Sequence, residues 1–229
     1  MASPIASLFN NIAQHYDLLN HLLSFNIDKI WRRKALKGHI SVDTQLVLDI
    51  ACGTGDFAVQ LIKSGAGQVV GVDISEEMIK VGKSKVDKQG LTSKVVLQMG
   101  DGASLEFIDN TFDLVTVAFG VRNFEKRAES LREMLRVLRP QGEVIILEFS
   151  TPHKFPIKQL YRFYFMHVLP CIGGIISGHR EAYQYLPNTV YAFPQGDQFV
   201  EEMRVAGFEN LSYQKMSFGI ATIYYGKKL

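Results

Sequence analysis

The sequence predicts an α/β fold: a mostly parallel β-sheet covered by helices, preceded by a helical lid and closed by an antiparallel hairpin. Two observations predict this class. Between residues 45 and 150, short apolar runs alternate with amphipathic helical segments, which is typical of buried parallel strands joined by crossover helices. The chain then ends in two strand-like runs around a short turn, which indicates a hairpin. No linker or repeat interrupts the 229 residues, so we expect one domain.

Composition narrows the class of protein. Hydrophobic residues make up 47% and charged residues 21%, which is globular rather than disordered composition. Lys and Arg number 25 against 23 Asp and Glu, and this near balance argues against a nucleic-acid partner. Two cysteines, Cys52 and Cys171, predict neither a disulfide framework nor a metal site. The start lacks the pattern of a secretory signal, and the apolar run 168–176 is shorter than the about 20 residues that span a bilayer, so we expect a cytoplasmic protein.

The first part of the chain reads as two helices. Ile30, Trp31 and Leu36 mark the second of them, which is expected to stop near Gly38. In the first helix, apolar residues recur at three- and four-residue spacing: Ile12, Tyr16, Leu19, Leu22 and Leu23. We expect residues 1–44 to form a helical lid.

Five apolar runs in the middle of the chain read as strands buried on both faces. They lie at residues 46–50, 69–72, 95–97, 114–118 and 144–147. Between them, Ser75 is placed to cap a helix whose first turn holds Glu76 and Glu77. A further amphipathic helix spans residues 128–138, and Pro140 is expected to end it.

The last third of the chain has a different character. Residues 155–176 are aromatic and mostly apolar, with no clean polar face, and 151–195 reads as an insertion in the α/β pattern. Residues 196–229 then give a helix that Gly207 stops and a hairpin with strands at 210–216 and 220–225. The second strand of a hairpin must run opposite to the first, so the sheet is expected to contain an antiparallel strand.

The most informative segment is a glycine-containing loop between a predicted strand and a predicted helix. It runs from Asp49 to Phe57, and Gly53 and Gly55 let the backbone approach a ligand closely. Asp73 ends the next strand, where an acidic side chain can accept both ribose hydroxyls of a nucleoside. The loop therefore predicts a Rossmann-like nucleoside site in the core, residues 45–150.

Two kinds of cofactor compete for this loop. Its spacing from Gly53 to Ala58 satisfies a dinucleotide-binding pattern, so a nicotinamide-dependent oxidoreductase stays an alternative. S-adenosylmethionine fits the acidic residues better, because its ammonium group needs a carboxylate such as Asp49. Asp101, which follows the third strand, can accept a hydrogen bond from the adenine amino group. Each acid alone also fits a turn or cap role, but three at successive strand ends favour the nucleoside.

These residues resemble a known family. The loop from Asp49 to Asp56 resembles motif I of the class I S-adenosylmethionine-dependent methyltransferases, with Ala51 in place of the usual first glycine. Other segments are similar to the ubiquinone/menaquinone biosynthesis C-methyltransferases, and the likeness extends from about Phe9 to Lys227. These segments are 16–20 with Ser24, 31–32, 119–123, 136–142, 148–150, 177–187 and 193–194.

The sequence departs from that family's pattern at three further positions. The family usually has Met at Leu19, His at Asp28 and Gly at Gln141. The change at Asp28 matters most, because an imidazole can carry a proton and an aspartate is not its equivalent. Any role given to that position is therefore left open.

The resemblance implies a site and a reaction. The reaction is methyl transfer from S-adenosylmethionine to a ring carbon of a polyprenylated quinol, with demethylmenaquinol expected first. Other methyltransferase substrates, including a small metabolite or RNA, and a non-catalytic scaffold stay alternatives. The implied cofactor-binding residues are Asp49, Gly53, Thr54, Gly55, Asp73, Ile74, Asp101, Gly102 and the backbone of Ala118.

Carbon methylation favours a ring hydroxyl that has lost its proton, so a general base is useful. Asp56 is the predicted proton acceptor, and Arg122 is expected to stabilise the ring oxyanion or hold a water. Asn123 beside it and Tyr16 from the lid complete the predicted catalytic set. Structural alternatives are a helix cap for Asp56, a surface ion pair between Arg122 and Glu125, and a core position for Tyr16.

The insertion carries one more expectation. Residues 158–176 are expected to form an apolar wall that admits an isoprenoid tail, with Lys154, Lys158 and Arg162 facing lipid headgroups. This predicts peripheral contact with the inner face of the cytoplasmic membrane. A homodimer is the other assembly that we consider.

Overall fold

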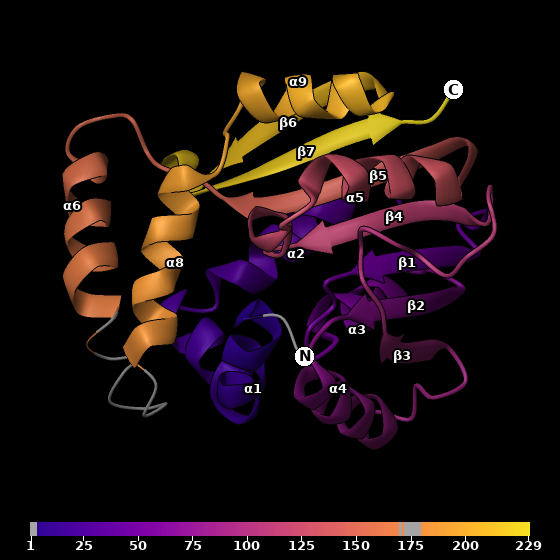
Figure 1. Cartoon of the computed structure of the whole chain (residues 1–229), viewed down its shortest axis with the longest axis horizontal. Coiled ribbons are helices and arrows are strands. Elements are labelled where there is room, and N and C mark those ends of the chain that lie inside the picture. The colour runs from indigo at the N-terminus through magenta and orange to yellow at the C-terminus, as the bar shows by residue number, and fades with distance from the viewer. Residues whose placement is uncertain (1–3, 170, 172–179) are drawn as a thin grey trace.

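The structure is a computed structural model that describes residues 4–169, 171 and 180–229, except for the side chains of His15, Leu19, Leu23 and 180–184. Two segments that the sequence analysis singled out, 172–176 of the apolar wall and the Ser177-Gly178 pair, lie outside the described residues. One seven-stranded sheet runs through the molecule in the order β3-β2-β1-β4-β5-β7-β6 (Figure 1).

The first five strands of the sheet are parallel, as the alternating sequence pattern predicts. Their apolar residues are buried because helices cover both faces of the sheet. The strands are β1 (Leu46–Ile50), β2 (Gln68–Asp73), β3 (Val95–Met99), β4 (Phe112–Ala118) and β5 (Leu138–Phe149).

The predicted hairpin closes the sheet. β6 (Glu209–Met216) and β7 (Ala221–Lys227) pair antiparallel around a short 3₁₀ turn, η3 (Ser217–Gly219). β7 also pairs antiparallel with β5 and so separates β6 from the parallel strands. The predicted fold class, a mostly parallel Rossmann-like sheet with antiparallel C-terminal strands, is confirmed.

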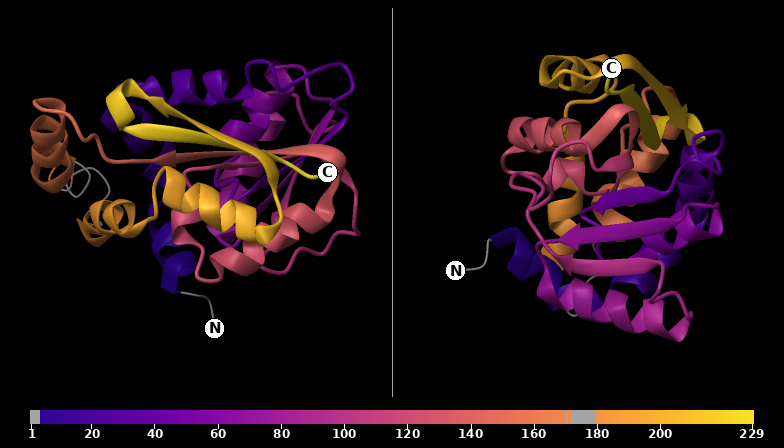
Figure 2. Two further views of the ribbon diagram at one scale, coloured as in Figure 1. Left: turned by 90° about the horizontal axis from the view of Figure 1, so that it is seen from above. Right: turned by 90° about the vertical axis from the view of Figure 1, so that its right-hand side faces the viewer.

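Two apolar cores lie on the two faces of the sheet. The right-hand view of Figure 2 shows helices on both sides of the sheet. On one face the sheet packs against α2 (Ile27–Leu36), α3 (Asp56–Lys63) and α4 (Glu76–Lys88). On the other face it packs against α5 (Arg127–Val137) and α9 (Asp197–Ala206). Of the predicted lid, α2 thus belongs to the core, because its Trp31, Ala35 and Leu36 are buried against the sheet.

A third apolar cluster lies beyond the carboxyl ends of the parallel strands. It joins α1 (Pro4–Leu23), α6 (Ile157–Phe163), the π-helical segment η2 (Tyr164–Val168) and α8 (Arg180–Ala192). Figure 1 shows these helices at the end of the sheet toward which the parallel strands point. Among the helices of the described ranges, none is long and apolar enough to cross a membrane.

Two boundaries differ from the sequence prediction around Pro140. α5 ends at Val137, three residues before the proline, and β5 begins at once at Leu138. Phe112 of β4 pairs with Leu138, and the register then shifts so that Leu114 pairs with Glu143. The sequence pattern predicts a strand only over the apolar run 144–147. Pairing with β4 on both sides of this irregularity makes β5 longer than that run.

Candidate active site

The loop after β1 contains three residues with positive φ. They are Ala51 at 53°, Gly53 at 54° and Gly55 at 80°. Glycine adopts this conformation freely, whereas the methyl group of Ala51 makes it cost about 1 kcal/mol. A Cβ on Gly120 would lie only 2.6 Å from the Cβ of Ala51, so the facing glycine leaves room for that methyl group. Gly120, which follows β4, therefore makes room for Ala51, the alanine that replaces the family's first glycine.

Asp73, at the end of β2, organises this loop. One carboxylate oxygen accepts a hydrogen bond from the backbone N–H of Gly53 at 2.8 Å, and the other accepts from Ser75 at 2.9 Å. Burial raises the pKa of Asp73 despite these two hydrogen bonds. Ser75 in turn caps α4, because its Oγ accepts from the N–H of Met78 at 3.2 Å, as the sequence predicts.

A cavity of about 690 Å³ opens over the carboxyl ends of β1 to β4. Four glycines are among its lining residues, and carboxylates lie at two of its strand ends. Asp101 is exposed there, and its Oδ1 accepts from the N–H of Ala103 at 2.9 Å. Six of the predicted cofactor-binding residues line this cavity: Gly53, Asp73, Ile74, Asp101, Gly102 and Ala118.

The other three predicted cofactor-binding residues do not line the cavity. Asp49 is buried under the loop, where Thr116 donates to its Oδ1 at 2.8 Å and burial raises its pKa to about 7. Its Oδ2 makes no hydrogen bond of ordinary geometry within the described ranges. The Thr54 hydroxyl turns toward Asp17 of the lid, and Gly55 packs on Leu97.

Asp56, the predicted proton acceptor, also lies outside the cavity walls. It begins α3 and forms ion pairs with Lys85 at 2.5 Å and with the Nε2 atom of His21 at 3.1 Å. Burial alone would raise its pKa, but the charges of Lys85, Arg32 and His21 hold the pKa of Asp56 below its usual value. The structure therefore places Asp56 in an ion-pair cluster and not in the wall of this cavity.

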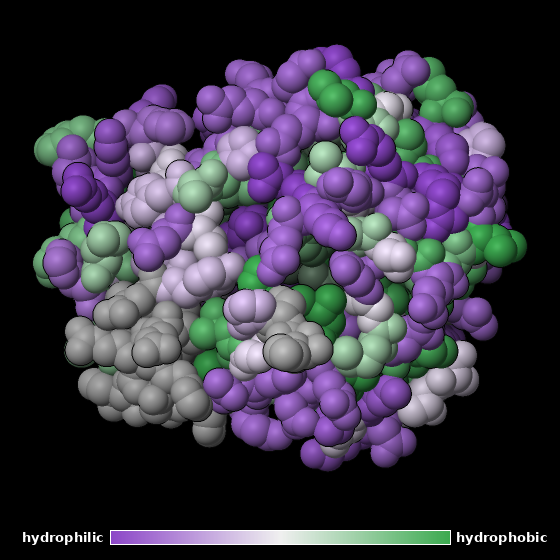
Figure 3. Space-filling view, viewed as in Figure 1, coloured by the Kyte–Doolittle hydropathy of each residue, from purple (hydrophilic) through white to green (hydrophobic). Residues whose placement is uncertain are grey.

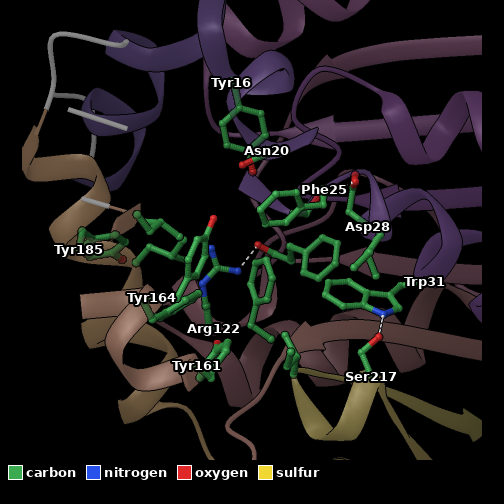
Figure 4. A pocket seen from close by; sticks show the side chains of 18 of the residues that line it. Tyr16, Asn20, Phe25, Asp28, Trp31, Arg122, Tyr161, Tyr164, Tyr185 and Ser217 are labelled. Carbon is green, nitrogen blue, oxygen red and sulfur yellow. Dashed lines mark hydrogen bonds between the residues drawn. The ribbon is translucent and has the colours of Figure 1, made fainter. Parts of the chain in front are cut away.

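A second, more apolar cavity of about 330 Å³ lies between the lid, the sheet end and α6 (Figure 4). Trp31, Phe149 and Tyr164 are among its walls, and Ser217 accepts a hydrogen bond from the Trp31 indole at 2.9 Å. Three residues line both cavities: Phe9, Tyr16 and Phe119. A group bound in one cavity can therefore face a group bound in the other across these side chains.

Arg122 brings a buried cation to the apolar cavity. Its side chain is 5% exposed, and its Nη1 donates at 2.8 Å to Oε1 of Glu148, which is fully buried. Glu148 also accepts from the backbone N–H of Arg122 at 3.1 Å, and the guanidinium lies 5.5 Å from the centre of the Phe149 ring. The structure thus pairs Arg122 with Glu148 in the interior rather than with Glu125 at the surface.

Tyr16 and Asn123 line different parts of the two cavities. Tyr16 lies where the two cavities meet, and burial raises the pKa of its phenol, so the hydroxyl stays a hydrogen-bond donor. Asn123 lines the larger cavity, and its Oδ1 accepts from the Tyr185 hydroxyl at 3.2 Å. Of the four predicted catalytic residues, Tyr16 and Arg122 therefore line the apolar cavity.

Sequence reasoning misses the partners of these groups. Glu148 and Arg32 both lie in segments that resemble the family, but the sequence pattern assigns neither a role. Asp28, whose role the sequence leaves open, is buried and is the one carboxylate among the described residues that line the apolar cavity. The signal in the sequence is a charged residue inside an apolar strand, as in the run from Ile146 to Phe149, because such a charge needs a buried partner.

The fold and the site together define a class of protein. A Rossmann-like sheet with a glycine loop after β1 and carboxylates after β2 and β3 is the architecture of the class I S-adenosylmethionine-dependent methyltransferases. Solved structures with this fold include a Thermotoga maritima S-adenosylmethionine-dependent methyltransferase described as a possible histamine N-methyltransferase. Its TM-score is 0.68 at 18% identity, covering 97% of this chain and 99% of that one.

Another structure with this fold is a Haemonchus contortus phosphoethanolamine N-methyltransferase 2 in complex with S-adenosyl-L-methionine. Its TM-score is 0.61 at 18% identity, covering 84% of this chain and 50% of that one.

Within this class, residues 2–228 match the model of the ubiE/COQ5 methyltransferase family, and the chain belongs to that family. A demethylmenaquinone methyltransferase of Bacteroides fragilis is 44% identical over 98% of this chain and 92% of its own length. A ubiquinone/menaquinone biosynthesis C-methyltransferase of Geotalea daltonii is 44% identical over 98% and 96%. The predictions of a methyltransferase and of S-adenosylmethionine as its methyl donor are confirmed.

Proposed function

We propose that this protein transfers a methyl group from S-adenosylmethionine to a ring carbon of a polyprenylated quinol, with demethylmenaquinol as the first candidate. The observation that carries the proposal is the meeting of two cavities at Phe9, Tyr16 and Phe119, one with carboxylates at strand ends and one apolar with a buried cation. The names of the relatives, demethylmenaquinone methyltransferase and ubiquinone/menaquinone biosynthesis C-methyltransferase, support the same substrate class.

In this proposal the larger cavity holds the cofactor. Asp73 keeps free lone pairs beside its two backbone hydrogen bonds and accepts the ribose hydroxyls. Asp101 accepts from the adenine amino group, and the backbone at Gly53 and Gly102 permits close approach. Bound S-adenosylmethionine supplies an electrophilic methyl group, so the protein chiefly aligns the acceptor carbon and excludes water.

The smaller cavity would hold the quinol ring. Aromatic side chains surround it, and Arg122 stabilises the negative charge that grows on a ring oxygen as the hydroxyl loses its proton. Glu148 positions the guanidinium, and the neutral Tyr16 phenol donates to a ring oxygen. We give Asp56 a structural role, because its oxygens are bound to Lys85 and His21. In its place, a water held by Arg122 would accept the proton.

The isoprenoid tail would leave the cavity along α6 and meet the membrane surface there. Figure 3 shows hydrophobic side chains over α6, at the left edge of the molecule, among hydrophilic ones. Exposed apolar residues include Phe155, Leu160 and Phe163, and Lys154, Lys158 and Arg162 are exposed between them. Apolar side chains that alternate with cations suit the boundary between acyl chains and anionic headgroups.

Product analysis tests the proposed function. Purified protein is incubated with S-adenosylmethionine and either a demethylated naphthoquinol or a demethylated benzoquinol, and the products are identified by mass spectrometry. We expect a naphthoquinol carrying one added methyl group on the ring carbon. Radiolabelled S-adenosylmethionine and NADH are compared in equilibrium binding on the same preparation.

Two results would contradict the proposal. Tight binding of S-adenosylmethionine with no methylation of either quinol would point to another methyl acceptor. Undiminished turnover by Arg122→Ala, with the quinol still methylated, would remove the role given to Arg122 while leaving the substrate class intact.

A further inference from the structure

His21 joins the lid to two other elements through both of its ring nitrogens. Its Nδ1 atom lies 2.9 Å from Oδ2 of Asp28 in α2, and its Nε2 atom lies 3.1 Å from Oδ2 of Asp56 at the start of α3. A neutral imidazole has one N–H and one lone pair, so only the doubly protonated ring can donate to both carboxylates. The arrangement of acceptors around His21 therefore suits an imidazolium.

His21 is the centre of a larger charged cluster. Lys85 of α4 pairs with Asp56 and with Asp17, each at 2.5 Å, and donates to the Thr54 hydroxyl at 3.1 Å. With a protonated His21, the cluster holds equal numbers of carboxylates and cations: Asp17, Asp28 and Asp56 with His21, Arg32 and Lys85. Loss of the imidazole proton leaves one unbalanced negative charge among partly buried groups, which is unfavourable.

The cluster reaches one cavity and not the other. Asp28 and Arg32 line the apolar cavity, where Asp28 is ion-paired with Arg32 and accepts from the Ser24 hydroxyl at 2.7 Å. None of the six charged residues lines the cofactor cavity. A change at His21 should therefore act on the quinol site before it acts on cofactor binding.

We propose that His21 is a positioning residue for the quinol cavity. Its protonated ring fastens α1 to Asp28 and to Asp56, and thereby holds the wall formed by Asp28 and Arg32 in the arrangement that accepts the substrate. The inference rests on the proposed function, because it takes the apolar cavity as the quinol site. A side chain at position 21 that cannot donate to both carboxylates should therefore weaken quinol binding.

Trp31 allows a direct measurement, because it is the single tryptophan of the chain and lines this cavity. Quenching of its fluorescence by a short-chain naphthoquinol gives a dissociation constant that does not depend on turnover. Relative to the wild-type protein, we expect this constant to rise roughly tenfold in His21→Gln at one fixed pH, through the loss of one charge-assisted hydrogen bond. Binding of S-adenosylmethionine, measured calorimetrically, should differ little between the two proteins.

Two variants and a matched control isolate the imidazole. His21→Gln is uncharged, so its quinol affinity should be weak. His21→Arg keeps a permanent cation that can donate to both carboxylates, so its affinity should stay near that of the wild-type protein. The control is His39→Gln, because His39 has a similar exposure, 26% against 21%, and pairs with Glu143 at 2.7 Å away from both cavities. His39→Gln should keep the wild-type quinol affinity.

The outcomes separate this inference from the proposed function. Wild-type quinol affinity in His21→Gln, or an affinity in His21→Arg as weak as that of His21→Gln, would overturn the role of His21. Should His21→Gln fail to fold, the comparison between His21→Arg and the wild-type protein decides the question. Absence of methylated quinol from the wild-type protein would contradict the proposed function without changing the fluorescence titrations.

Discussion

At the scale of single residues, two carboxylates beside the glycine loop have different roles. Asp73 accepts from the backbone N–H of Gly53 in the loop and from that of Ser75, and it lines the larger cavity. Asp49 lies beneath the loop with one oxygen bound to Thr116 and lines neither of the two cavities described above. Substitution of each should therefore affect different measured properties.

Asp49→Asn should stabilise the fold at alkaline pH. Burial raises the pKa of Asp49 to about 7, above its value in the unfolded chain, so the folded state loses stability as pH rises from about 4 to about 7. Asparagine does not ionise, so its free energy of unfolding should exceed that of the wild type by about 1–3 kcal/mol at pH 8. The difference should disappear near pH 4, and urea denaturation at both pH values checks it. Equal stability at pH 8 would contradict the raised pKa.

Asp73→Asn should weaken binding of S-adenosylmethionine by more than tenfold. The variant removes the charged acceptor of the Gly53 N–H and of the ribose hydroxyls, and hydrogen bonds to charged groups contribute about 1.5–3 kcal/mol each. Asp101→Asn is the matched comparison, because Asp101 is exposed and its loss should cost only a few-fold in affinity. Isothermal titration calorimetry measures both, and the reverse order of effects would contradict the assignment.

At the scale of elements, the glycine loop is held close to α4 by three glycines that share one neighbour. Leu97 of β3 occupies the space that Cβ atoms on Gly55, Gly71 and Gly82 would need, since its methyl carbons would lie 3.1, 2.5 and 2.6 Å from them. A Cβ on Gly82 would also come within 3.1 Å of the backbone of Thr54. The absence of these side chains lets β2, β3, α4 and the loop approach one another.

Gly82→Ala should destabilise the protein although alanine favours helices. Without a clash the change would stabilise α4 by about 1 kcal/mol, but contact with Leu97 should turn this into a loss of about 1–3 kcal/mol. In a Leu97→Ala background the loss should be smaller, because the 2.6 Å contact is gone and only the 3.1 Å contact with the Thr54 backbone remains. Free energies of unfolding from a double-mutant cycle test the coupling, and equal losses in both backgrounds would contradict it.

The ends of helices and strands show how much of the fold the local sequence predicts. Gly207 stops α9 and Ser75 caps α4 where the sequence predicts, because both signals act within one turn of the chain. Pro140 does not set the end of α5, since β5 already begins at Leu138 through its pairing with β4. A helix or strand boundary that depends on pairing with another strand is set by long-range contacts, and the local sequence pattern does not reveal those contacts.

At the scale of the whole molecule, the end of the sheet that carries the proposed site also carries exposed apolar side chains on α6. The left-hand view of Figure 2 shows α6 and α8 beyond the end of the sheet. α6 turns Tyr161 inward and leaves Leu160 and Phe163 outside. In the following η2 segment, Phe165 packs inside the molecule at 3% exposure, against 62% for Phe163. Of the two phenylalanines, Phe163 alone is therefore suited to contact lipid.

Phe163→Ser with Leu160→Ser should reduce sedimentation with anionic liposomes severalfold, because both side chains lie on the exposed face of α6. Val205→Ser is the matched control, since Val205 is 71% exposed on α9, a helix that packs against α5 and β6. The control should bind liposomes like the wild type. Unchanged sedimentation of the double variant would contradict the membrane contact.

A homodimer stays a prediction that analytical ultracentrifugation checks.

The sequence by itself determined the α/β class, the glycine loop and the acids at the strand ends. Each of these depends on neighbours within a few residues, and parallel strands place their carboxyl ends at one edge of the sheet. Only the tertiary structure decided which charged groups meet, as Arg122 with Glu148 and His21 with Asp56 show. Such pairs join elements far apart in the chain, so their partners depend on which helix faces pack together. The same packing places Asp28, but not Asp56, among the residues that line the apolar cavity, although both belong to one ion-pair cluster.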